Sequence, residues 1–225
     1  MNSLDRAVQA LEEHLRGLSF DKAAIDRIIC QDLPFLTTWE LTPNPLQELE
    51  NADAVMTFAF GFGPAKEQVQ HPPGQYHPQL FDPGKSNEGL AEVIVPFAQK
   101  GLPIFAQWEV AEALNARGIA VPDHQVARPD RRYLGTSGVV EQFLVNGLAN
   151  STSVLLVAHP HHVFRCREIT NMVFQKNGKA ISILIADTCL VPYDPKSVQP
   201  WTRSLKAWVE YEVGNRFNNR FQGNM

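Results

Sequence analysis

The spacing of hydrophobic positions changes near residue 50. Before this point, apolar side chains recur every three or four residues, which is the spacing of an amphipathic helix. They form two sets, the first Leu4, Val8, Leu11, Leu15 and Leu18, and the second Ala24, Ile25, Ile28 and Ile29. Two prolines, Pro43 and Pro45, then break the pattern. We therefore expect residues 1–50 to form a helical segment that packs on the rest of the chain.

From residue 51 onward, short apolar runs alternate with stretches of helical spacing. The runs predict strands at residues 53–60, 102–106, 125–127, 154–158 and 181–186. The stretches between them predict helices at residues 87–100, 109–117, 137–148 and 163–175, and a last helix after Pro200. Ser86 and Thr136 are the candidate N-caps of two of these helices. The pattern is typical of an α/β fold with a mostly parallel open sheet and helices on both faces. We expect a Rossmann-like domain over residues 51–225 with an N-terminal helical extension.

Composition and charge narrow the class of partner. The 225 residues are 44% hydrophobic and 20% charged, which allows a substantial core. The net charge is −4 and no run of Lys or Arg occurs, so we expect no nucleic-acid partner. The three cysteines form no C-x-x-C pair, and we see neither a secretory leader nor an apolar stretch of about 20 residues. We expect a soluble, cytoplasmic protein without a membrane span, and the oligomeric state stays open.

The run at residues 154–158 ends in a cluster of histidines and an arginine. The apolar strand is followed by His159, His161 and His162, and Arg165 comes three residues later. Parallel strands deliver such polar groups to the carboxyl edge of a sheet, where α/β proteins bind ligands. His162 and Arg165 share the first turn of the next helix, where the free N–H groups and the helix dipole favour an anion. The alternatives are that these two pair with a core carboxylate or bind a neighbouring carbonyl, and that His159 donates to a loop carbonyl.

Glu109 is a second candidate for chemistry, since it begins a helix directly after a strand. A carboxylate there can act as a general base or bind a sugar hydroxyl, although a first-turn acid also simply complements the helix dipole. We assign His162 and Glu109 as candidate catalytic residues. Residues expected at the same edge are the candidate ligand-binding set: Gly61, Gly63, Asn87, Glu88, Gln107, Thr136, His159, Arg165 and Arg203.

Three histidines within four residues also raise the question of a metal. Imidazole suits zinc, and the further ligands would come from His71, His77, Asp82 or Asp187. Adjacent histidines on one turn rarely reach the same ion and no H-E-x-x-H helix occurs, so we assign no metal ligand. His71 and His77 belong to residues 66–85, a polar stretch without periodicity that predicts a long loop and a candidate lid.

Taken in order, these segments resemble the SanA/YdcF-like family, which has a Rossmann-like fold. Residues 53–61 resemble its first strand and glycine turn, residues 109–119 its "sEA…Gv" helix, and Thr136 its threonine ahead of a helix. Residues 154–165 resemble "vllVTs.yHm.Ra", with His162 and Arg165 in the H-x-x-R positions. The family's Ser-Gly-Gly is replaced by residues 106–108, its arginine is absent near Asn87, and the asparagine after the threonine is missing. The resemblance covers residues 52–215 and implies a divergent member, with S-adenosylmethionine as one candidate ligand.

The sequence therefore predicts a protein that binds a small anionic molecule, nucleotide-like or phosphorylated, at the carboxyl edge of a parallel sheet. The expected reaction is hydrolysis or transfer of a phosphate ester. Two alternatives stay open at this point. One is a non-catalytic protein that binds S-adenosylmethionine or a nucleotide, and the other is a hydrolase with a histidine-bound metal.

Overall fold

The apolar runs predicted as strands form one sheet in the computed structural model, which describes residues 3–32, 38–65, 81–129 and 134–221. Within these ranges the strands are β1 (Ala54–Thr57), β2 (Ile104–Gln107), β3 (Val126–Ala127), β4 (Ser153–Val157) and β5 (Ser182–Ile185). All neighbouring strands pair in parallel, in the order β3-β2-β1-β4-β5. The predicted α/β fold with an open parallel sheet is confirmed.

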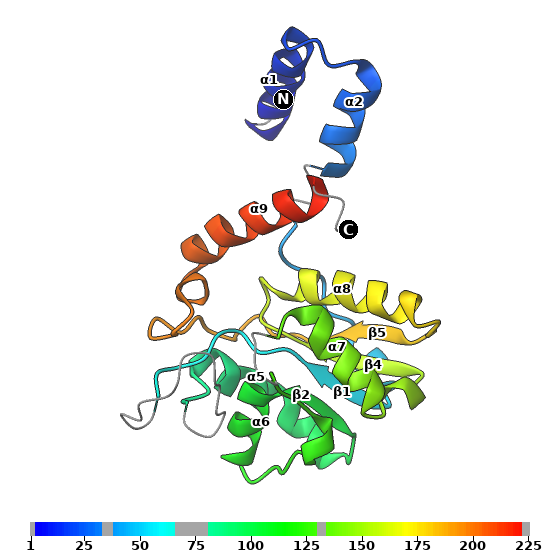
Figure 1. The fold of residues 1–225 in the computed structure, drawn as a ribbon, viewed down its shortest axis with the longest axis vertical. Helices are drawn as coiled ribbons and strands as arrows, with labels where there is room; N and C mark the ends of the chain where they lie inside the picture. The colour runs from blue at the N-terminus through cyan, green and yellow to red at the C-terminus, as the bar shows by residue number, and fades with distance from the viewer. Residues whose placement is uncertain (1–2, 33–37, 66–80, 130–133, 222–225) are drawn as a thin grey trace. The chain divides into compact units, whose positions relative to one another are not determined.

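Helices cover both faces of this sheet (Figure 1). Helices α5 (Lys85–Gln99) and α6 (Trp108–Asn115) lie on one face, and α7 (Thr136–Val145) and α8 (Val163–Lys176) lie on the other. Alternate strand residues therefore enter two separate cores. Val55 packs in the core that holds α5 and α6, whereas Met56 packs in the core that holds α7 and α8. Because every side chain of β1 is buried, polar groups can reach a ligand only beyond the end of the strand.

Most helix boundaries lie within two residues of the predicted ones, but both predicted N-caps are wrong. Ser86 lies inside α5, which begins at Lys85, and its hydroxyl donates a hydrogen bond to the carbonyl of Pro192 at 2.8 Å. Thr136 is the first residue of α7, and Gly135 occupies the cap position. Gly84 and Gly135 occupy the two cap positions, so no capping side chain marks either helix start in the sequence.

The described contacts divide the chain into two units, Trp39–Glu210 and Met1–Thr38 with Tyr211–Met225. The smaller unit contains α1 (Ser3–Gly17) and α2 (Lys22–Arg27), which confirms the predicted N-terminal helices, and the end of α9 (Leu205–Phe221). The predicted packing of residues 1–50 on the main domain stays a prediction. Residues 39–50 belong to the larger unit, where Asn44 exchanges two hydrogen bonds with the backbone of Ile185 at the edge of the sheet. Across the described residues, none of the helices has the length and apolar character that a bilayer crossing requires.

The turn after β1 is held by one asparagine side chain. Asn87 is fully buried; its Oδ1 accepts from the Phe60 N–H at 2.9 Å, and its Nδ2 donates to the carbonyls of Gly61 at 2.7 Å and Pro83 at 2.6 Å. Gly61 has φ +74°, and a Cβ there would stand 2.2 Å from the Thr202 hydroxyl oxygen. The turn therefore needs both the amide of Asn87 and the missing side chain of Gly61.

We expect Asn87→Ala to lower the free energy of unfolding by about 3 kcal/mol, because it leaves several buried backbone groups without partners. Urea denaturation measures the loss. The matched control is Asn115→Ala at the exposed end of α6, which should change stability by less than about 0.5 kcal/mol. Equal effects of the two variants would contradict the role assigned to Asn87.

Candidate functional site

A pocket lies at the carboxyl edge of the sheet, beyond β1 and its two neighbours. The chain builds the sheet outward from β1 through β2 and β3, and then returns to add β4 and β5 on the other side. The strand order thus reverses between β1 and β4, and open α/β sheets bind ligands in the crevice outside such a switch point. The segments that follow β1, β2 and β4 all contribute to the pocket wall, through Gly61, Glu109 and His162 respectively.

The polar part of the pocket brings together five of the predicted site residues. Its empty space is about 310 Å³. The predicted residues in its wall are Gly61, Gln107, Glu109, Thr136 and His162, and the others are Ala59, Leu134 and Gln199. These residues come from five separate segments, so only the folded chain assembles them.

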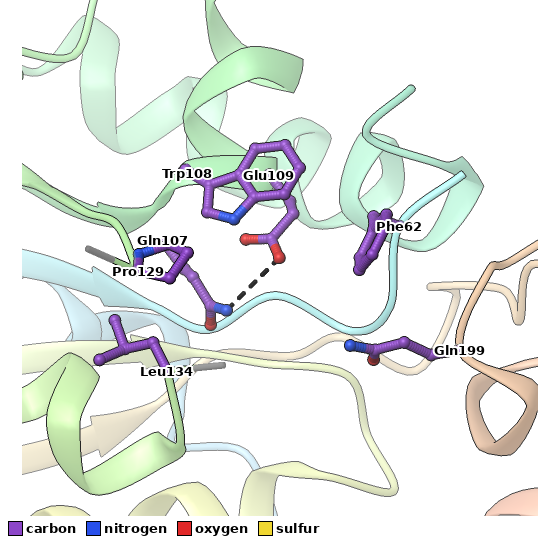
Figure 2. Close-up of a pocket in the computed structure, with 7 residues that line it drawn as sticks. All are labelled: Phe62, Gln107, Trp108, Glu109, Pro129, Leu134 and Gln199. Atoms are coloured by element: carbon purple, nitrogen blue, oxygen red, sulfur yellow. Dashed lines mark hydrogen bonds between the residues drawn. The ribbon is translucent and has the colours of Figure 1, made fainter. Parts of the chain in front are cut away.

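A second, adjoining part of the pocket has both apolar and polar residues in its wall (Figure 2). Its empty space is about 290 Å³. It shares Gln107, Glu109, Leu134 and Gln199 with the polar part and adds Phe62, Trp108 and Pro129. Glu109 therefore lies where the two parts meet.

Glu109 is a buried carboxyl that has no cation beside it among the described residues. Only 4% of Glu109 is exposed, and this burial raises the pKa of its carboxyl from the usual 4.5 to about 8. Its own backbone N–H lowers the pKa by a smaller amount. Among the described residues, Oε2 of Glu109 has no hydrogen-bond partner. At neutral pH the side chain is thus mainly a neutral acid that can donate a hydrogen bond to a ligand.

Gln107 determines which oxygen of the Glu109 carboxyl accepts a hydrogen bond. The N–H of Ala59 donates to Oε1 of Gln107 at 3.1 Å, so the NH₂ group of the amide faces the other way. Nε2 of Gln107 then donates to Oε1 of Glu109 at 3.5 Å, as the dashed line in Figure 2 marks. Since Oε1 acts as an acceptor, Oε2 is the oxygen of Glu109 that is left to carry the proton.

His162 reaches the polar part of the pocket from the N-terminus of α8. It occupies the cap position of this helix, and its ring packs at 5.2 Å from the Trp208 ring and 5.9 Å from the Phe60 ring. Arg165, predicted to bind the anion beside it, places its guanidinium 5.2 Å from the centre of the Trp208 ring, a cation–π distance. The structure thus puts His162 in the pocket wall and Arg165 against the Trp208 ring, outside the two parts of the pocket described above.

The two other histidines have different surroundings. His159 is fully buried and stacks on Phe60 with ring centres 3.9 Å apart. Burial and, to a smaller extent, the neighbouring His161 lower the pKa of His159 to about 3, so its imidazole is neutral. His161 instead places Nε2 at 2.9 Å from a carboxylate oxygen of Glu40. The three histidines therefore do not converge on one point.

No group of three or more His, Cys, Asp or Glu side chains within the described ranges is arranged to hold a metal ion. His71 and His77, which the sequence offered as further ligands, lie outside the described residues, as does most of the predicted loop at 66–85.

Six predicted ligand-binding residues do not line either part of the pocket: His159 and Arg165, described above, and Gly63, Asn87, Glu88 and Arg203. The N–H of Gly63 donates to the carbonyl of Asp82, and Asn87 holds the turn after β1. Glu88 and Arg203 are exposed, and Nε of Arg203 donates to the Ser197 carbonyl at 2.6 Å. The structure gives Gly63 and Asn87 roles in the backbone that positions the site.

Sequence reasoning missed several residues of the pocket wall, of which Gln199 is the polar one. Gln199 lies in the loop after β5, which is tied to the segment after β1 because the hydroxyl of Ser197 and the N–H of Val198 both donate to the Phe62 carbonyl. The signal for Gln199 was its place after the last strand, at the carboxyl edge. The apolar wall residues Phe62, Trp108, Pro129 and Leu134 have no such signal, because their sequence pattern is that of core or loop positions.

Comparisons of the chain with models of known protein families, with curated proteins and with solved structures found no match. The resemblance to the SanA/YdcF-like family therefore stays a prediction, and the description of the site depends on its geometry alone.

Proposed function

We propose that this protein binds a small anionic molecule, nucleotide-like or phosphorylated, in the pocket at the switch point, and hydrolyses or transfers its phosphate ester. The observation that carries the proposal is that Glu109 and His162, from segments far apart in the chain, line one pocket together with the N-terminus of α7. An acid, an imidazole and a helix N-terminus around one space are the groups that phosphate-ester chemistry needs.

The anion would be held by the first turn of α7 and by His162. Thr136 is the first residue of this ten-residue helix and lines the pocket. The first N–H groups of a helix have no partner within the helix, and the dipole places partial positive charge there. His162 adds a ring N–H donor from the α8 side. The Arg165 charge, one turn further along α8, would contribute to the local field.

Proton transfer would be divided between Glu109 and His162. Water attacks phosphorus and gives a proton to the His162 imidazole, while the bond from phosphorus to the leaving oxygen breaks. The leaving oxygen takes the proton from Oε2 of Glu109, which is the protonated oxygen in the geometry described above. Exchange with solvent returns His162 and Glu109 to their starting states.

Glu109 also supports a second candidate, non-catalytic binding of a nucleotide or S-adenosylmethionine. The Glu109 carboxyl follows β2 at the crevice. In dinucleotide-binding folds, an acidic residue at a similar place binds the ribose hydroxyls. The two candidates differ in turnover, since a binding protein would be stabilised by its ligand and release no product.

We expect His162→Gln and Glu109→Gln each to lower kcat for p-nitrophenyl phosphate by about 100-fold, the usual worth of a general acid or base. Thermal unfolding with inorganic phosphate, AMP and S-adenosylmethionine measures binding in parallel; a ligand at about 100 times its Kd stabilises the fold by about 2.7 kcal/mol.

The control for these variants is His124→Gln at an exposed position, which should leave both turnover and stabilisation unchanged. Stabilisation by AMP or S-adenosylmethionine without turnover would favour the binding candidate. Failure of every anion to stabilise the protein, or equal activity in all variants, would contradict the proposed function.

The raised pKa of Glu109 predicts a particular pH dependence of stability. Between about pH 4.5 and pH 8, the folded state keeps the proton that the unfolded chain has lost. The unfolded state binds fewer protons in this window, so the free energy of unfolding falls as the pH rises, by at most about 1.4 kcal/mol per pH unit from this group. Glu109→Gln should remove this contribution, so the variant gains stability relative to wild type from pH 5 to pH 8.

Urea unfolding at several pH values measures this difference. Glu141→Gln, at an exposed position of α7, is the matched control, and its difference from wild type should stay constant with pH. Parallel curves for wild type and Glu109→Gln would mean that Glu109 ionises normally in the folded protein.

A further inference from the structure

The wall of the pocket changes its chemical character on either side of Glu109. On one side the polar groups of Thr136 and His162 face the space, together with Gly61. On the other side the wall gains the aromatic and aliphatic side chains of Phe62, Trp108 and Pro129, which join Leu134 and the polar residues Gln107 and Gln199 that line both parts. A ligand that fills both parts therefore has a polar end and an apolar end.

The apolar wall is preformed because its aromatic rings are fixed by one another. The Phe62 ring centre lies 5.2 Å from that of Phe81 and 5.9 Å from that of Trp108, and the exposed fractions of Phe62 and Trp108 are 6% and 2%. Leu134 and Pro129 lie across the space from Phe62, with the Glu109 carboxyl between them (Figure 2). Rings held in this way offer a rigid surface to a ligand without the entropy cost of ordering it on binding.

The size of the apolar part restricts what it can accept. Its empty space of about 290 Å³ includes space that is open to solvent, so the enclosed part is smaller than this. A compact group therefore suits this space better than a long acyl chain does. Aromatic walls also favour a flat ring, because ring edges and faces attract one another beyond the area they bury.

We propose that the ligand is an anionic ester whose organic part is a single flat ring, with the anion at Thr136 and His162 and the ring at Phe62, Trp108 and Leu134. This inference rests on the proposed function and names its substrate class. Glu109 lines both parts of the pocket, so a ligand that fills both would have its ester oxygen next to Oε2 of Glu109. The ester oxygen would receive the proton from Oε2 there.

Isothermal titration of the full chain with phosphonates, which cannot be hydrolysed, tests the proposal. The probes are methylphosphonate, phenylphosphonate and hexylphosphonate, which share the anion and differ in the apolar group. We expect phenylphosphonate to bind about tenfold more tightly than methylphosphonate, and more tightly than hexylphosphonate.

The variant Leu134→Gln places a polar group in the apolar wall at a half-buried position, and Leu190→Gln is the matched control at a side chain that is 92% exposed. In Leu134→Gln the preference for phenylphosphonate should fall to about twofold or less while methylphosphonate still binds. Leu190→Gln should keep the full preference. Thermal unfolding verifies that both variants are folded. If Leu134→Gln is not folded, Leu134→Ala, which only shortens the side chain, takes its place.

Each contrary result has its own meaning. Equal binding of methylphosphonate and phenylphosphonate would overturn the ring site and leave the proposed anion site standing. Tightest binding of hexylphosphonate would overturn the assignment of a flat ring. An unchanged preference in both Leu134 variants would show that the ring binds elsewhere. Failure of all three phosphonates to bind would overturn the proposed function as well.

Discussion

The position of β1 at the centre of the sheet is the constraint on which the other features depend. It pairs with β2 on one side and with β4 on the other, and helices cover both faces. No side chain of β1 can reach solvent, so the chain presents polar groups only after the strand has ended. The turn beyond it is then held by the buried amide of Asn87 and by the loop after β5. These two contacts fix the backbone that carries Gly61 and Phe62 to the pocket wall.

The main electrostatic feature of this pocket is a carboxyl that burial keeps protonated. A buried charge without a partner is costly, and Glu109 avoids that cost by holding its proton up to about pH 8. An apolar residue would be less costly than an acid at a buried position. Among the described residues Oε2 of Glu109 has no hydrogen-bond partner at the pocket wall, which is consistent with the role proposed for that oxygen. Gln107 supports this view, because its amide is oriented by the Ala59 N–H and leaves Oε2 as the donor. Glu109 and Gln107 together give the pocket a fixed donor between its polar and apolar parts.

Histidines that are close in the sequence have different environments in the fold. His159 is neutral and stacked in the core, His161 pairs with Glu40, and only His162 reaches the pocket wall. In the sequence the three form one motif, but they lie on the turn between the end of β4 at Val157 and the start of α8 at Val163, where the backbone changes direction, and their side chains have different neighbours. The same change of direction carries Arg165 onto the Trp208 ring.

The sequence by itself determined the fold class, the order of strands and helices along the chain, and the edge of the sheet at which the pocket lies. These follow from hydrophobic period and from the rule that polar residues after parallel strands meet at one edge, so the places of His162 and Glu109 in the pocket wall could be predicted without a structure. The helix starts of α5 and α7 were misplaced because glycines, which have no side chain that could cap a helix, occupy both cap positions. Tertiary structure alone decided that Asn87 is structural, that Gln199 and the apolar wall join the pocket, and that the Glu109 proton is retained. The reason is that burial, amide orientation and wall composition depend on contacts between distant segments, which local sequence pattern does not encode.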